Sequence, residues 1–121
     1  MRIGKLFKFE AAHRLPNHPG KCKNLHGHSY KLEVVVNGEV NFFSGMVIDF
    51  DIITGLVNRI IIDNVDHQFL NDVYPNMETT AENLVTKFYN SLVRDIEDGE
   101  FSWSIEKLRL WETETCYAEV P

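Results

Sequence analysis

The sequence predicts an α+β fold with the element order ββααββ. Alternating apolar and polar residues mark strands at both ends of the chain, whereas two central segments carry apolar residues at helical spacing. Neither a linker nor an internal repeat divides the 121 residues. We therefore expect one domain that spans residues 1–121.

The first strand is predicted over residues 2–14, which show the period-two pattern of a strand with one buried face. Its apolar side comprises Ile3, Phe7, Phe9 and Ala11. His13 continues this odd-numbered face. Residues 15–25 contain two prolines and a glycine, and they indicate a loop.

The second strand is predicted over residues 26–37, and Asn37-Gly38 marks the turn that follows it. Its apolar side comprises Tyr30, Leu32, Val34 and Val36. His26 and His28 have the same parity as these residues. Both imidazoles should therefore project from the same side of the strand.

Two helices are predicted in the middle of the chain. The first covers residues 52–62, with Ile53, Leu56, Val57, Ile60 and Ile61 at helical spacing. The second begins near Thr79 or Thr80, because Thr79 and Glu82 have the spacing of a capping box, and it ends before Gly99. Residues 103–112 and 116–120 then return to strand character around a short polar turn.

The composition restricts the function classes. A formal net charge of −6 argues against general binding to nucleic acid through a basic face. Because no segment approaches the roughly 20 apolar residues of a membrane span, and the first residues lack the apolar core of a signal peptide, we expect no membrane partner and a cytoplasmic protein. In that compartment Cys22 and Cys116 are more plausible as free thiols than as a disulfide.

A chain of this size has little depth for an enclosed cavity, which favours a site completed by neighbouring subunits. A phosphorylated substrate would need local cations. Arg14, Lys21 and Lys23 lie around the histidines in the sequence.

Three histidines form the candidate metal site. His26 and His28 alternate on one strand face, and His13 on the other strand could supply a third nitrogen. Three imidazoles leave one position of a tetrahedral zinc ion open, as catalytic zinc requires. The alternative is a set of hydrogen-bonded histidines without a metal.

Cys22 could be a fourth zinc ligand that closes a structural site, or a nucleophile or base beside an open one, and spacing does not decide between these roles. A thiolate near zinc, Lys21 and Lys23 would suit proton abstraction. Cys116 in a terminal strand fits a small packing residue.

Three further positions are weaker candidates. Asp66-His67 in a loop could form an acid-base pair, although such a pair is usually only solvated. The carboxylate of Glu112, at a strand end, could accept two N–H bonds from an aminopyrimidine ring, or it could simply be exposed. Thr79 and Thr80 are first of all helix-capping residues, with ligand contact a second possibility.

Several motifs together resemble the 6-pyruvoyl-tetrahydropterin synthase family over nearly the whole chain. They are FEAAHRL, CKNLHGH, VIDF, VDHQFLN, TTAENL and WET. The spacing CxxxHGH is similar to that of the queuosine-pathway branch of the family, the 6-carboxy-5,6,7,8-tetrahydropterin synthases. Met77 to Thr80 lacks the proline often found before the family's threonine.

The resemblance implies the tunnelling fold, in which a four-stranded antiparallel sheet carries two helices on one face. Trimers close a barrel, two trimers stack into a homohexamer, and active sites lie between subunits. By position it implies zinc on His13, His26 and His28 and Cys22 as the general base. It also implies Asp66 and His67 as partners in proton transfer, Glu112 as the pterin anchor and Thr80 as a pterin contact.

The implied reaction converts 7,8-dihydroneopterin triphosphate to 6-carboxy-5,6,7,8-tetrahydropterin with loss of triphosphate and acetaldehyde. One alternative is the same fold and metal with a reaction that ends at 6-pyruvoyl-tetrahydropterin. The other is a non-catalytic zinc protein in which Cys22 closes a structural site and the oligomer is a scaffold.

Overall fold

One twisted sheet carries the fold, and the computed structural model describes it over residues 1–121. The long strands are β1 (Arg2–His13), β2 (His26–Gly38), β4 (Trp103–Trp111) and β5 (Tyr117–Val120), each antiparallel to its neighbour. A two-residue strand, β3 (Gln68–Phe69), pairs in parallel with β1 and gives the sheet order β3-β1-β2-β4-β5. The expected four-stranded sheet therefore gains a fifth, short edge strand, which is too brief to leave a periodic pattern in the sequence.

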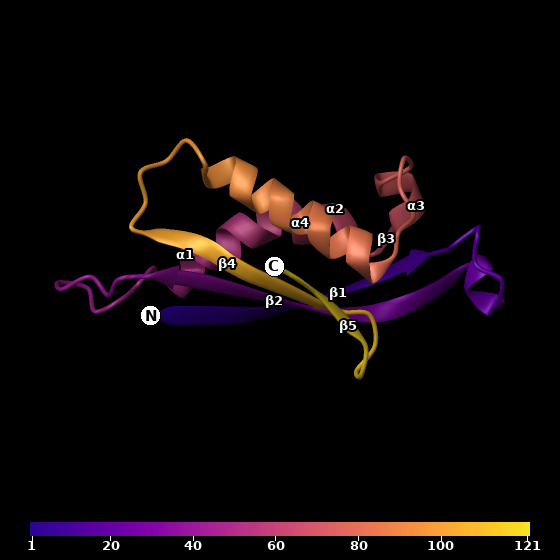
Figure 1. Ribbon diagram of the computed structural model, residues 1–121, viewed down its shortest axis with the longest axis horizontal. Helices are drawn as coiled ribbons and strands as arrows, with labels where there is room; N and C mark the ends of the chain where they lie inside the picture. Colours follow the sequence, from indigo (N-terminus) through magenta and orange to yellow (C-terminus); the bar gives the residue numbers. More distant parts are fainter.

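The helices cover one face of this sheet (Figure 1). They are α1 (Phe50–Val57), α2 (Asp63–Val65), α3 (Leu70–Val73) and α4 (Ala81–Ile96). The two predicted helices correspond to α4 and to the continuous segment from α1 to α2. None of the helices combines the length and the apolar character that a membrane span requires.

A π-helical turn at Asn58–Ile62 joins α1 to α2. The buried residues of this segment, Ile53, Val57, Ile61 and Val65, recur every four positions. On an α-helix of 3.6 residues per turn this spacing would rotate by about 40° at each step. A wider π-helical turn reduces that rotation, so all four side chains stay against the sheet.

The core lies between the sheet and the helices and is a single cluster of 21 buried apolar residues. The odd positions of β1 and the even positions of β2 face it, as their patterns predict. Phe9 stacks on Tyr30 with ring centroids 4.8 Å apart and contacts Phe88 of α4 edge-on. His13 ends this inward face and is fully buried.

Helix α4 starts one residue later than the predicted capping box requires. Thr80 is the N-cap, and its hydroxyl accepts a hydrogen bond from the backbone N–H of Asn83 at 3.2 Å. The predicted pairing of Thr79 with Glu82 is therefore wrong. Thr79 is instead fully buried and contacts His13, so its hydroxyl is not available for capping.

Candidate metal centre and active site

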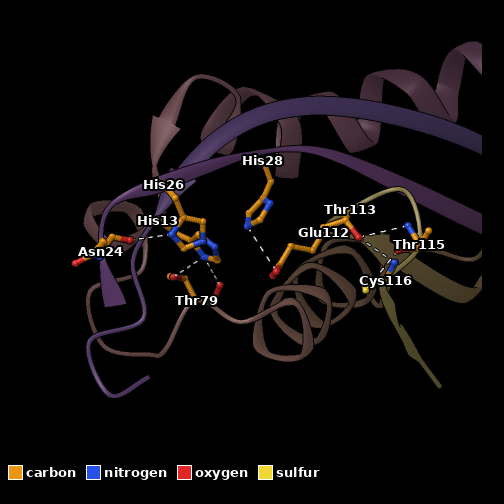
Figure 2. Close-up of polar contacts among 9 residues, drawn as sticks. All are labelled: His13, Asn24, His26, His28, Thr79, Glu112, Thr113, Thr115 and Cys116. Atoms are coloured by element: carbon orange, nitrogen blue, oxygen red, sulfur yellow. Dashed lines mark hydrogen bonds and ion pairs between the residues drawn. The ribbon is translucent and has the colours of Figure 1, made fainter. Parts of the chain in front are cut away.

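The pairing of β1 with β2 brings the three predicted histidines together. His13 lies directly opposite His26, and Ala11 lies opposite His28, so all three side chains leave the same face of adjacent strands. Their ring centroids are 4.6, 5.2 and 4.9 Å apart, and one ligand atom from each lies within 4.8 Å of the others. Figure 2 shows the cluster.

Main-chain carbonyls orient two of the rings. The Nδ1 of His13 lies 2.8 Å from the carbonyl oxygen of Thr79, and the Nδ1 of His26 lies 2.8 Å from that of Asn24. Because a carbonyl only accepts, each Nδ1 carries the proton and donates it, which leaves each Nε2 with a free lone pair. This is the arrangement in which an imidazole binds a metal through Nε2.

Two of these nitrogens lack a hydrogen-bond partner. The Nε2 atoms of His13 and His28 are both buried and make no hydrogen bond. Burial lowers the pKa of His13 and of His28, against the opposing effect of the nearby Glu112 carboxylate, so both rings favour the neutral form that a metal requires. Three imidazoles with converging nitrogens fit a zinc ion that has one open position.

Cys22 lies in a short 3-10 helix, Lys21–Lys23, between β1 and β2. Its carbonyl accepts a hydrogen bond from the backbone N–H of Leu15 at 2.9 Å, which folds the loop back against the end of β1. The thiol is free and partly buried. The group of converging ligand atoms contains only the three histidines, so the structure does not bring Cys22 in as a fourth ligand.

Asp66 and His67 form the expected pair at a different place, beside the edge of β1 that pairs with β3. Their side chains lie 3.0 Å apart, and Asp66 also accepts a hydrogen bond from the backbone N–H of Glu10 at 3.0 Å. That backbone hydrogen bond is the main cause that lowers the pKa of Asp66. The backbone of His67 is in the left-handed region, with a φ of 59°, and its N–H donates a hydrogen bond to the Glu10 carbonyl.

The side chain of His67 is 78% exposed and lines an open groove of about 480 Å³. His28 of the metal site also lines this groove, together with Glu10 and Ser29, whose parity is opposite to that of the metal-site histidines. The groove therefore lies beside the metal site and opens toward the other face of the sheet. No hydrogen bond or ion pair joins His67 to Cys22. Within one chain, the polar contacts therefore join Asp66 to His67 but do not join this pair to Cys22.

Glu112 follows β4 and points toward the histidines (Figure 2). One carboxylate oxygen lies 3.5 Å from the Nε2 of His28. Two hydrogen bonds in the β4–β5 turn hold the backbone of Glu112 in place. The Glu112 N–H donates to the Cys116 carbonyl at 3.0 Å, and the Thr113 hydroxyl accepts from the Cys116 N–H at 3.1 Å. Glu112 is thus held at the edge of the metal site, where a bound ring could reach it.

Sequence reasoning missed two contributors to the site. Asn24 orients His26 through its carbonyl, and Thr79 orients His13 through its carbonyl and hydroxyl. A backbone carbonyl leaves no signal in the residue type. Thr79 did offer a signal, since two adjacent threonines stand before α4 and a helix needs only one N-cap.

Known proteins match this chain over nearly its full length. Residues 2–121 match the family model described as 6-pyruvoyl tetrahydropterin synthase. A Haemophilus influenzae protein named 6-carboxy-5,6,7,8-tetrahydropterin synthase is 37% identical over 142 residues, which cover 98% of this chain and 96% of that relative. An Aquifex aeolicus protein of the same name is 32% identical and covers 97% and 95%.

The solved structure of Caenorhabditis elegans 6-pyruvoyl tetrahydropterin synthase superposes with a TM-score of 0.86 at 26% identity, covering 99% of this chain and 94% of that one. The expected α+β fold and the resemblance drawn from the motifs are both confirmed. The chain belongs to the 6-pyruvoyl tetrahydropterin synthase family.

Proposed function

We propose that this protein is a zinc-dependent lyase that converts 7,8-dihydroneopterin triphosphate to 6-carboxy-5,6,7,8-tetrahydropterin, acetaldehyde and triphosphate in queuosine biosynthesis. The observation that carries the proposal is the convergence of three histidine nitrogens within 4.8 Å of one another. The spacing from Cys22 to His26 and the names of the bacterial relatives favour the carboxy product over the pyruvoyl product.

The residues would divide the work as follows. His13, His26 and His28 would hold the zinc ion, which, when bound, polarises oxygens of the substrate side chain and acidifies the adjacent C–H bonds. The Cys22 thiolate would remove a proton from the substrate carbon. The Glu112 carboxylate would accept N–H bonds from the pterin ring and hold it in register.

The triphosphate needs cations beside this site. Arg14, Lys21 and Lys23 are exposed on the loop between β1 and β2 and take part in none of the ion pairs of the structure. They are free to neutralise a polyanion. Thr80 already caps α4 through its side chain, so its proposed contact with the pterin would use the remaining capacity of that hydroxyl.

A neighbouring subunit would complete the site. Asp66 and His67 lie at the edge of β1, and no hydrogen bond or ion pair joins them to Cys22. In an oligomer, Asp66 and His67 of one copy would therefore transfer protons together with Cys22 of a neighbouring copy. We accordingly infer a homo-oligomer, built as two stacked trimers, that acts in the cytoplasm. Mass measurement of the native zinc-loaded protein in solution tests the hexamer.

Incubation of the zinc-loaded protein with 7,8-dihydroneopterin triphosphate tests the reaction, with the pterin and acetaldehyde identified by mass spectrometry. Carboxytetrahydropterin with acetaldehyde supports the proposal. Pyruvoyl-tetrahydropterin without acetaldehyde assigns the chain to the other branch of the family. A zinc-bound oligomer with no turnover contradicts the enzymatic proposal and favours a structural zinc protein.

A further inference from the structure

One side chain, Asn71 of α3, joins the end of β1 to the segment that enters α4. Its Nδ2 donates to the carbonyl of Arg14 at 2.8 Å, and its Oδ1 accepts from the N–H of Arg14 at 2.9 Å. The hydroxyl of Thr79 lies 3.5 Å from the same Oδ1. An amide that bonds both polar groups of one residue fixes that residue as a neighbouring strand would.

Both partners of Asn71 lead to His13. Arg14 follows His13 in the chain, so its backbone sets where β1 ends. Thr79 contacts the ring itself, with its carbonyl oxygen 2.8 Å and its hydroxyl 3.2 Å from the Nδ1 of His13. Asn71 therefore reaches one imidazole from two directions, through the main chain and through the Thr79 side chain.

The segment around Thr79 is itself held on both sides. Asn83 donates to the carbonyl of Glu78 at 2.9 Å, and Asn17 donates to the Glu78 carboxylate at 2.8 Å. Thr80 caps α4 immediately after Thr79. The Thr79 carbonyl is thus part of a fixed frame, and a fixed acceptor defines the orientation and tautomer of the ring that donates to it.

We propose that Asn71 and Thr79 are positioning residues of the metal centre, which hold His13 so that its Nε2 converges with those of His26 and His28. Neither residue is a metal ligand. The role accounts for two motifs, because Asn71 ends VDHQFLN and Thr79 begins TTAENL. The inference rests on the zinc site of the proposed function and adds the side chains that give that site its geometry.

The experiment measures zinc affinity by competition with a chromogenic chelator for the wild type, Asn71→Ala and Thr79→Val. Removing Asn71 should weaken zinc binding about 10-fold, the lower end of the range for loss of a direct partner of a ligand, because Asn71 acts on His13 only through Arg14 and Thr79. Thr79→Val keeps the side-chain volume and the Thr79 carbonyl that accepts from His13, so zinc affinity should fall by less, about 3-fold. The double variant should lose less than the product of the two single losses, because both act through His13.

Asn64→Ala is the matched control. Asn64 also donates from its side-chain amide to a main-chain carbonyl, that of Ile60 at 2.9 Å, but it lies in α2 without contact to the histidines. Its zinc affinity should stay within about twofold of the wild type. The cobalt-substituted proteins give a second readout, because a displaced His13 alters the visible absorption of the metal in Asn71→Ala and not in Asn64→Ala.

Unchanged zinc affinity in folded Asn71→Ala overturns the inference. If that variant does not fold, the same result for Thr79→Val overturns it. An equal loss in Asn64→Ala also overturns it, because the effect then reflects general destabilisation. A wild-type protein that binds no zinc contradicts the proposed function itself, whereas tight wild-type binding with unchanged variants contradicts only the positioning role.

Discussion

Replacing Tyr30 with phenylalanine should stabilise the fold, although Tyr30 is one of the largest residues of the core. Its ring is 1% exposed and stacks on Phe9 at 4.8 Å with an interplanar angle of 7°. Its hydroxyl is buried without a hydrogen-bond partner. A phenylalanine ring at this position would keep the stacking on Phe9 and would remove the unpaired hydroxyl.

The size of the effect follows from the cost of that hydroxyl. Burial raises the pKa of Tyr30, so the group is a neutral phenol at ordinary pH and no buried charge is involved. A buried polar group without a partner costs about 1–3 kcal/mol. Taking the lower end, we expect the free energy of unfolding to rise by about 1 kcal/mol and the Tm by about 4 °C for a chain of this length.

Urea unfolding of the metal-free protein is the appropriate assay, because bound zinc would add its own stabilisation. Tyr74→Phe is the control, because Tyr74 is a half-buried tyrosine that packs near Phe88. Unlike Tyr30, it does not have a buried, unpaired hydroxyl. It should change stability by less than about 0.5 kcal/mol. A loss of about 1 kcal/mol or more in Tyr30→Phe would refute the reasoning and would mean that the hydroxyl has a partner in the folded protein.

Three other perturbations test the site. Cys22→Ala should retain zinc by metal analysis while turnover in the product assay falls at least about 100-fold, and loss of the metal would instead identify Cys22 as a ligand. Glu112→Gln should weaken binding of an unreactive pterin, followed by its fluorescence, about tenfold or more, because neutralising a carboxylate forfeits charge-assisted hydrogen bonds; equal affinities would exclude the anchor role. The metal-free protein should unfold more easily at pH 5.5 than at pH 7.5. Since burial lowers the pKa of His13 and His28 below the value of 6.5, the unfolded chain binds more protons as the pH falls through that value, and stability is lost; identical urea midpoints at the two pH values would contradict this.

The convergence of the histidines could be predicted because strand parity is a local property. His26 and His28 share one face by their spacing, and His13 continues the apolar face of the preceding strand. Two antiparallel strands that bury the same face then need only the correct register to bring the rings together, and in the structure His13 pairs with His26. The buried faces of β1 and β2 were predictable for the same reason.

Other features depend on contacts that no local pattern records. The π-helical turn at Asn58–Ile62 lets every fourth residue of the segment from Ile53 to Val65 pack against the sheet. This spacing can be recognised only when the packing of the segment on the sheet is known. β3 owes its two residues to the hydrogen bonds that β1 offers along its edge. The prediction of Thr79 as a helix cap was wrong because its hydroxyl, although suited to capping, contacts the buried imidazole of His13 instead.

The metal site itself contains one histidine oriented by a local contact, His26, and one oriented by a distant contact, His13. His26 is oriented by a carbonyl two residues away, so its conformation is specified locally, whereas the acceptor of the His13 proton lies 66 residues further along the chain. A metal bound by these rings therefore requires that β1 and the entry to α4 are already in contact. Because ligand binding to the folded form alone stabilises that form, zinc would in turn strengthen this contact between distant segments. Metal binding and tertiary structure should accordingly fail together when the connection through Thr79 is weakened, while the local pairing of His26 with Asn24 persists.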